Sequence, residues 1–207
     1  MRRPLHSGIK TVLYAVAIFF LTPGGARGPL DADRMTASVR IFYAPRDNLR
    51  EIDRAVISSA RQTIDFTGYV LTDRSIAEAL SDAARRGVKV RLYLDPDQPA
   101  VRRPDANPAF WSLVGQKGVE ARIKTGGNDL MHLKAYQVDG RILRSGSANF
   151  SVSGGQYQDN DLLLIEGRDA VGSFVRQFEY LWDRPGNTPL NRDMPPAARR
   201  FLGDDRP

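Results

Sequence analysis

The stretch of chain that decides both the fold and the chemistry spans residues 132–149 and reads HLKAYQVDGRILRSGSAN. It places His132 and Lys134 two residues apart on an expected strand, where alternate side chains point to the same face. An imidazole and an ammonium on one face can serve as a nucleophile and an anion clamp. Ser147 and Asn149 add hydrogen-bond donors, and the small residues beside them would let a phosphate approach the backbone closely.

Strand patterns and helix patterns alternate on both sides of this stretch. β-rich or alternating runs predict strands over residues 38–43, 63–70, 88–94, 119–124, 133–138, 141–144 and 161–165. Helical spacing of apolar residues predicts helices over residues 49–60, 75–86 and 169–182, with a short helix beginning at residue 108. A tight hairpin turn is expected at Asp139-Gly140. The alternation predicts an α/β domain with a mixed, mostly parallel sheet flanked by helices.

The spacing His-x-Lys-x4-Asp-x6-Gly-Ser-x-Asn resembles the hallmark of the phospholipase D superfamily, in one copy. The resemblance extends to 68–72, 76–80, 86–90 and Asp159-Asn160, which are similar to the small bacterial endonuclease branch of that superfamily. It covers roughly residues 38–183 and implies the phospholipase D fold.

The resemblance also implies roles for individual residues. His132 matches the nucleophile that forms a phosphohistidine intermediate, and Lys134 matches the residue that neutralises the phosphoryl oxygens. Asn149 and Ser147 match positions that line the phosphate site. Asp139 belongs to the motif, where it is thought to serve structure and charge balance, and we group it with the catalytic set.

A carboxylate beyond the Gly-Ser pair, usually Glu, orients the histidine in the family. Asp159 occupies that place here and is one methylene shorter, with Asp161 as the fallback. The family needs no metal, and the sequence offers no His/Asp cluster typical of a metal site. The absence of cysteine excludes a disulfide framework and thiolate metal ligands. We therefore expect no cofactor.

The first residues are typical of a targeting segment. Arg2, Arg3 and Lys10 precede a short apolar run over residues 11–21, and small residues follow it. We expect a signal peptide over 1–26, a linker over 27–37, the catalytic domain over 38–183 and a Pro-rich tail over 184–207. This division predicts export to the periplasm or the medium; the alternative is an uncleaved segment that tethers the domain to a membrane.

Loss of the first 26 residues would leave one histidine, because His6 lies in that segment. Displacement at a phosphodiester needs an attacking group on one side and a proton donor for the leaving oxygen on the other. One imidazole cannot fill both positions in the same step. We therefore expect a two-fold homodimer in which two copies of His132 share an active site.

Two substrate classes remain open at this stage, with nucleic acid as the leading one and phospholipid as the alternative. The basic residues that favour nucleic acid are Arg85, Arg86, Lys89, Arg91, Arg102, Arg103, Lys124 and Arg144. An apolar rim around the site in place of a basic groove would favour phospholipid. A phosphate-binding module without catalysis is a third possibility, and Tyr69, Thr72 and Trp111 are interpreted as core residues.

Overall fold

The structure is a computed structural model, and it describes residues 37–102, 106–125 and 129–191. The strands are β1 (Ser38–Ala44), β2 (Thr63–Gly68), β3 (Lys89–Leu94), β4 (Val119–Ile123), β5 (Lys134–Val138), β6 (Ile142–Ser145), β7 (Asn160–Glu166) and β8 (Thr188–Leu190). The helices are α1 (Leu49–Ser58), α2 (Arg74–Arg85), α3 (Pro99–Arg102), α4 (Pro108–Val114), α5 (Val152–Gln156) and α6 (Arg168–Trp182). The α/β class predicted from the sequence is confirmed.

The described strands form one mixed sheet in the order β1-β7-β6-β5-β2-β3-β4-β8. Only β2–β3 and β3–β4 pair in parallel, whereas the other five neighbouring pairs are antiparallel. The expectation of a mostly parallel sheet was wrong in this respect. The physical reason is that β5 and β6 are joined by a tight hairpin, and that the connection from β6 through α5 returns to the same end of the sheet, so β7 also runs antiparallel to its neighbour.

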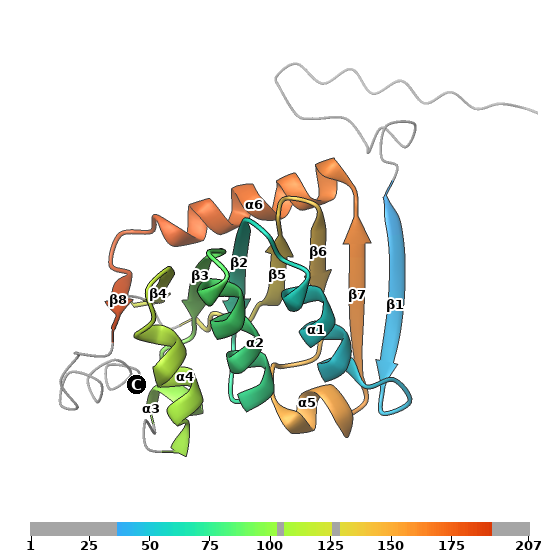
Figure 1. The fold of residues 1–207 in the computed structure, drawn as a ribbon, viewed down its shortest axis with the longest axis horizontal. Helices are drawn as coiled ribbons and strands as arrows, with labels where there is room; N and C mark the ends of the chain where they lie inside the picture. The colour runs from blue at the N-terminus through green and yellow to red at the C-terminus, as the bar shows by residue number, and fades with distance from the viewer. Residues whose placement is uncertain (1–36, 103–105, 126–128, 192–207) are drawn as a thin grey trace, which may run out of the picture. The chain divides into compact units, whose positions relative to one another are not determined.

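Helices cover both faces of the sheet (Figure 1). α1, α2 and α4 lie on one face, and α6 crosses the other. Apolar residues of α1 and α2 recur at helical spacing and bury one side of each helix, for example Val56 and Ile57 in α1 and Leu80 in α2. Alternate strand residues such as Ile64 and Phe66 meet them, and this layer forms the main core.

The sheet continues beyond the boundary expected at residue 183. β8 pairs antiparallel with β4, with Leu190 opposite Ala121, so part of the expected tail belongs to the domain. Its three residues contain a proline at an edge strand, a position that tolerates the missing N–H. The predicted signal peptide and nearly all of the linker lie outside the described residues. Within the described ranges, no helix has the length and hydrophobicity needed to span a bilayer.

The sheet has two distinct ends. Strands β2 and β3 finish at Gly68 and Leu94, and β5 begins beside them, with Lys134 opposite Gly68. We call this end of the strands the motif end. The strand directions place the starts of β1, β2, β3 and β4 at the other end of the strands, which we call the opposite end. Ligands of open α/β sheets bind where parallel strands finish, which is the motif end here.

Candidate active site

The segment that follows β2 holds the two halves of the motif together. The Tyr69 N–H donates to the Leu133 carbonyl at 3.0 Å, which fixes the chain between His132 and Lys134. The Phe150 N–H donates to the Val70 carbonyl at 3.1 Å, which fixes the chain just after Asn149. One short stretch after a parallel strand therefore fixes both ends of a motif that is eighteen residues long.

His132 and Lys134 are in direct contact. The Nζ atom of Lys134 lies 3.0 Å from Nε2 of His132 and donates to the His132 carbonyl at 2.8 Å. An ammonium can only donate, so Nε2 accepts and the ring proton of a neutral His132 sits on Nδ1. In that tautomer the Nε2 lone pair accepts from Lys134, and it becomes available for attack when the ammonium turns to a bound anion.

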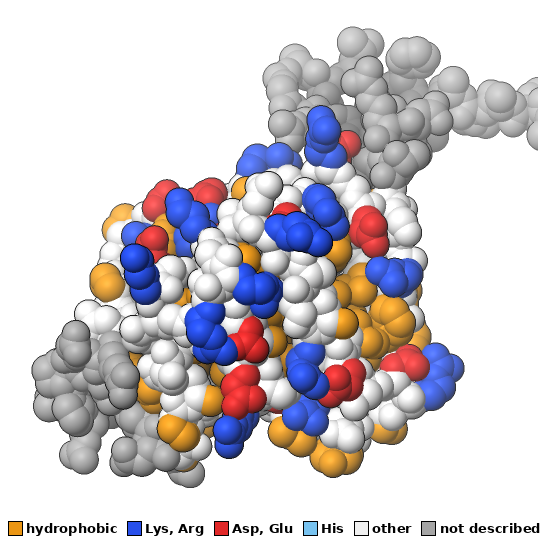
Figure 2. All heavy atoms as spheres, in the orientation of Figure 1, with side chains coloured by type: hydrophobic (Ala, Val, Ile, Leu, Met, Phe, Trp, Pro, Cys, Tyr) orange, Lys and Arg blue, Asp and Glu red, His pale blue; other side chains and the backbone are white. Residues whose placement is uncertain are grey.

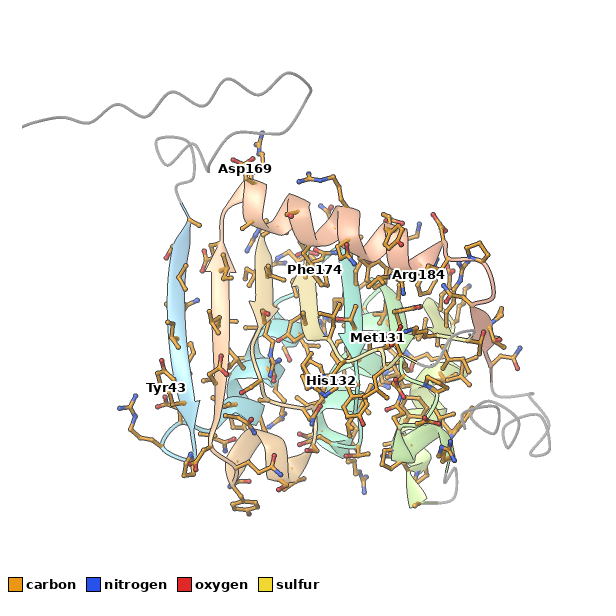
Figure 3. The ribbon with its side chains drawn as sticks, turned by 180° about the vertical axis from the view of Figure 1, so that it is seen from behind. Tyr43, Met131, His132, Asp169, Phe174 and Arg184 are labelled. Atoms are coloured by element: carbon orange, nitrogen blue, oxygen red, sulfur yellow. The ribbon has the colours of Figure 1, made fainter. Side chains whose placement is uncertain are left out.

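His132 does not belong to β5, contrary to the expectation that both residues share one strand face. It lies in the extended segment before the strand and is exposed, whereas Lys134 is the first residue of β5 and is buried. The side chains meet because Lys134 folds back over the His132 carbonyl. Figure 3 shows His132 at the lower edge of the sheet, away from α6.

Tyr69 is a part of the site that the sequence interpretation assigned to the core. Its ring lies 4.5 Å from the His132 ring, centroid to centroid, at 54°. The Nζ atom of Lys134 lies 4.8 Å from the centroid of the same ring, within the range of a cation–π contact. The available signal was its place directly after a buried parallel strand, where ligand sites form.

Burial of the Lys134 ammonium lowers its pKa, and the positive charge of Arg144 lowers it further. Arg144 is fully buried and pairs with Asp53 of α1, which is also buried. It therefore cannot contact a nucleic acid backbone, although the sequence analysis counted it among the basic residues that favour such a substrate.

A buried carboxylate holds the chain segment that precedes His132. Asp95, which follows β3 directly, is fully buried and accepts from the Met131 N–H at 2.8 Å through Oδ2. Its other oxygen, Oδ1, accepts from the Asp97 N–H at 2.9 Å. Asp95 thereby fixes the residue before His132 to the end of a parallel strand.

Ser147 and Asn149 both lie in the loop that follows β6, at the motif end of the sheet. Asn149 is half-buried, and its Oδ1 atom is buried with no hydrogen-bond partner among the described residues. The Ser147 hydroxyl donates to Asn160 at 3.0 Å and accepts from the Asp161 N–H at 2.9 Å, so it closes the loop onto β7. Gly146 has a φ of 141°, and a Cβ there would lie 2.4 Å from the Asp161 carbonyl oxygen. Only glycine permits this close approach.

Asp139 lies at the opposite end of the sheet and not with the catalytic pair. It has a φ of 54° in the predicted hairpin turn, and its carboxylate accepts from the backbone N–H groups of Arg61, Gln62 and Thr63. Burial raises its pKa, but these hydrogen bonds outweigh burial and the net shift is downward. It lies five residue steps along the strand from Lys134, or about 17 Å, so it has no catalytic contact within this chain.

Neither carboxylate proposed to orient the histidine touches it within one chain. Asp159 is exposed in the loop before β7. Asp161 accepts from the Ser147 N–H at 3.1 Å and so supports the Gly-Ser turn. The orienting role therefore stays a prediction that a single copy does not satisfy. No group of three or more His, Asp or Glu side chains suited to a metal occurs in the described ranges.

Most of the cations counted in favour of nucleic acid lie away from His132, but Lys124 directly follows β4 at the motif end, where its ammonium donates to the Asp129 carbonyl. Arg86 and Lys89 lie where β3 begins, at the opposite end. Three cations that the sequence analysis did not count lie at the same end, namely Arg61, Lys117 and Arg141. Arg91 pairs with Asp65 and Glu179 across the sheet from α1. Arg102 pairs with Asp97, and Arg103 lies outside the described residues.

Exposed apolar side chains lie at the motif end instead. Leu130 and Leu133 flank His132, Val152 and Tyr157 lie on and beside α5, and Tyr43 lies near the finish of β1. We call these five residues the apolar rim. Figure 2 shows hydrophobic side chains at the lower end of the molecule, where Figure 1 places α5. These apolar side chains are exposed at the same end of the sheet as His132.

This fold and this pair of side chains define a class of proteins with an adjoining His–Lys pair where the parallel strands of a mixed α/β sheet finish. Residues 54–182 match the family described as "Cardiolipin synthase, PLD-like domain". The chain belongs to this family of phospholipase D-like domains, as the motif predicted.

Curated relatives carry related names. The chain is 28% identical over 128 residues to a mitochondrial cardiolipin hydrolase of Chlamydomonas reinhardtii, covering 61% of this chain and 54% of the relative. It is 30% identical over 124 residues to a phospholipase D of Rickettsia prowazekii, covering 59% of this chain and 57% of the relative. The chain thus spans about half the length of the curated relatives it matches.

Solved structures share the fold. Nuc of Salmonella typhimurium, a phospholipase D family member, superposes with a TM-score of 0.65 at 23% identity, covering 75% of this chain and 99% of that one. NucT of Helicobacter pylori gives a TM-score of 0.65 at 22% identity, covering 72% and 97%. These similarities confirm the phospholipase D/nuclease fold predicted from the sequence.

Proposed function

We propose that this chain is a metal-independent phosphodiesterase in which His132 attacks the phosphorus and Lys134 neutralises the phosphoryl oxygens. The observation that carries the proposal is the 3.0 Å contact between Nζ of Lys134 and Nε2 of His132 at the exposed motif end. An anion entering there meets an ammonium and an imidazole lone pair together, which is the pairing that phosphoryl transfer requires.

The reaction proceeds in two balanced steps. Nε2 of His132 forms a bond to phosphorus while the bond from phosphorus to the leaving oxygen breaks, and a general acid protonates that oxygen. A water molecule then attacks the phosphohistidine, its proton passes to the same group acting as base, and the P–N bond breaks. The second group must stand opposite His132 across the phosphorus.

A homodimer supplies that second group, as His132 of a second copy. The described part of the chain contains one histidine, and its edge strand β1 leaves Val39, Ile41 and Tyr43 each about half exposed on one face. Three large apolar side chains on an uncovered sheet face favour burial against another protein surface. Tyr43 and His132 lie at the same end of the sheet in Figure 3.

Phospholipid is the substrate class that the surface favours. The apolar rim places exposed side chains suited to acyl chains at the same end of the sheet as His132, and relatives of the chain are named cardiolipin hydrolase and phospholipase D. Nucleic acid, ranked first from the sequence, becomes the second candidate because most of its supporting cations are buried, paired or at the opposite end, and Lys124 is the exception at the motif end. Because the fold is similar to those of Nuc and NucT, the experiment below also includes nucleic acid substrates.

The deciding experiment compares wild type with His132→Ala on phosphatidylcholine and cardiolipin vesicles, plasmid DNA and single-stranded RNA, all with EDTA present. We expect lipid turnover by the wild type and loss of at least about 1,000-fold in the variant. Turnover that survives the substitution would refute the proposal, and DNA or RNA cleavage alone would reverse the substrate order.

Oligomeric state and processing need separate measurements. We expect light scattering to give twice the chain mass, and mixing His132→Ala with wild type to depress activity more than dilution does. An active monomer would contradict the shared site.

N-terminal sequencing of the protein recovered from an exporting host tests the predicted cleavage after residue 26, and an intact N-terminus would favour a membrane tether.

A further inference from the structure

Arg144 occupies an unusual position, directly beneath the active site. It lies on β6 and is fully buried, and its Nε and Nη2 atoms donate to the two carboxylate oxygens of Asp53 at 2.9 and 3.1 Å. The Tyr136 hydroxyl donates to the same carboxylate at 2.9 Å. Burial raises the pKa of Asp53, and the charge of Arg144 opposes that effect.

The remaining donors of Arg144 bind the two halves of the motif. Nη1 donates to the Lys134 carbonyl at 2.8 Å, and Nη2 also donates to the Ala148 carbonyl at 3.3 Å. One planar guanidinium therefore sets the separation between the strand that carries Lys134 and the loop that carries Asn149. Its carbon also lies 4.5 Å from the centroid of the Phe150 ring, which fixes the residue after Asn149.

A buried ion pair is a poor means of adding stability, because removing two charges from water offsets most of their attraction. Well-packed apolar residues of similar volume often stabilise a protein equally well or better. The geometry of four donated hydrogen bonds is the property that apolar residues could not reproduce. Lysine could not reproduce it either, since an ammonium lacks the planar fork.

We infer that Arg144 is a positioning residue that holds Lys134 and Asn149 at the separation needed to grip one phosphate. The inference rests on the proposed function for its catalytic consequence, and it concerns the same site. Arg144 touches no substrate. It acts through the backbone of the two segments and through its charge, which weakens the hold of the Lys134 ammonium on its proton.

The test replaces the whole buried network at once, with Arg144→Met, Asp53→Leu and Tyr136→Phe in one full-length chain. We expect a folded protein with a Tm close to wild type and a kcat about 100-fold lower, because small displacements of catalytic groups have effects of that size. Arg144→Lys alone is the second variant, and it serves as the test if the network variant does not fold. We expect it to fold and to show a similar loss of kcat.

The matched control is Arg91→Met with Asp65→Asn, which removes a second, less buried arginine–aspartate pair from the α6 side of the sheet. We expect it to keep the wild-type kcat. An equal loss in this control would show a general effect of losing an ion pair and would overturn the inference. A wild-type kcat in both the network variant and Arg144→Lys would overturn it as well.

Two further readouts do not depend on turnover. NMR titration of Lys134 should give a higher midpoint in Arg144→Met with Asp53 retained, since only the Arg144 charge is then removed, and inorganic phosphate should bind the network variant at least about tenfold more weakly. If wild type cleaves nothing, the proposed function fails, but these readouts still judge Arg144. An unchanged Lys134 midpoint together with unchanged phosphate binding would refute its positioning role.

Discussion

The two ends of the sheet carry different parts of one continuous motif and differ in almost every physical property. At the motif end, His132 and Lys134 meet at an exposed edge bordered by apolar side chains. At the opposite end, Asp139 turns the chain and accepts backbone hydrogen bonds beneath a group of cations. Strand β5 joins the two, so residues adjacent in a motif can lie a full strand apart.

The difference teaches that a motif combines residues for chemistry with residues for folding. Lys134 is held in a buried position that lowers its pKa, a cost to stability that a reactive group can justify. Asp139 has its pKa lowered by hydrogen bonds that its charge strengthens, which is a gain in stability. Substitutions at the two ends should therefore separate activity from stability.

The largest effect is expected for Lys134→Met. Loss of the ammonium removes the neutralising charge from the phosphate, so kcat/KM should fall about 100- to 1,000-fold. Stability should hold or rise, because a buried charge has been removed. Steady-state kinetics and thermal unfolding measure the two quantities. Lys117→Met at the opposite end is the matched control, and a loss of activity there would erase the contrast between the ends.

Asp139→Ala should show the reverse behaviour. Three backbone N–H groups lose a charged acceptor, and the free energy of unfolding should drop by about 2 kcal/mol. Activity per folded molecule should stay within about twofold of wild type. Denaturant titration measures the first effect, with Asp159→Ala as an exposed control. A large fall in kcat at unchanged stability would return Asp139 to the catalytic set.

The pH dependence of stability should reveal the contribution of the Asp139 charge. The folded-state pKa of Asp139 is lowered, so its contribution to stability is present above the ordinary aspartate pKa and is lost as the pH falls through the folded value. We expect the free energy of unfolding to decline more steeply below about pH 4 in wild type than in Asp139→Asn. Parallel curves for the two proteins would contradict this assignment.

The smallest effect is expected from neutralising the cations of the opposite end. Arg61→Gln, Lys89→Gln, Lys117→Gln and Arg141→Gln together should change kcat/KM on any substrate by less than about twofold. The salt dependence of DNA binding should also stay the same, because these residues lie far from the site. A tenfold loss on DNA with a shallower salt slope would restore nucleic acid to first place.

Local patterns in the sequence predicted most of the elements. The hairpin at Asp139-Gly140 has positive φ at both residues, as the Asp-Gly pair predicts. The spacing of apolar residues located α1, α2 and α6 to within about two residues. Strand order was less accessible, since periodicity shows that a segment is a strand but not which neighbour it joins. β8 was missed because three residues carry too little pattern.

The sequence predicted the site residues that belong to the motif. It did not predict the residues that join the site through contacts between distant segments. His132 and Lys134 followed from the motif. Tyr69 contacts them only because β2 pairs with β5, a relation between segments more than sixty residues apart. Arg144 looked like a surface cation because its partner Asp53 lies on a helix ninety-one positions earlier. Burial of a charged side chain depends on such partners, which composition does not reveal.

Strand β1 starts at the opposite end and finishes at the motif end, so the chain enters the domain on the side away from His132. A bead, a sensor chip or a fluorescent fusion joined upstream of Ser38 will thus meet the domain at its far side. The reactive histidine then faces the bulk liquid, which makes N-terminal immobilisation the practical arrangement for titrating vesicles or oligonucleotides over the protein.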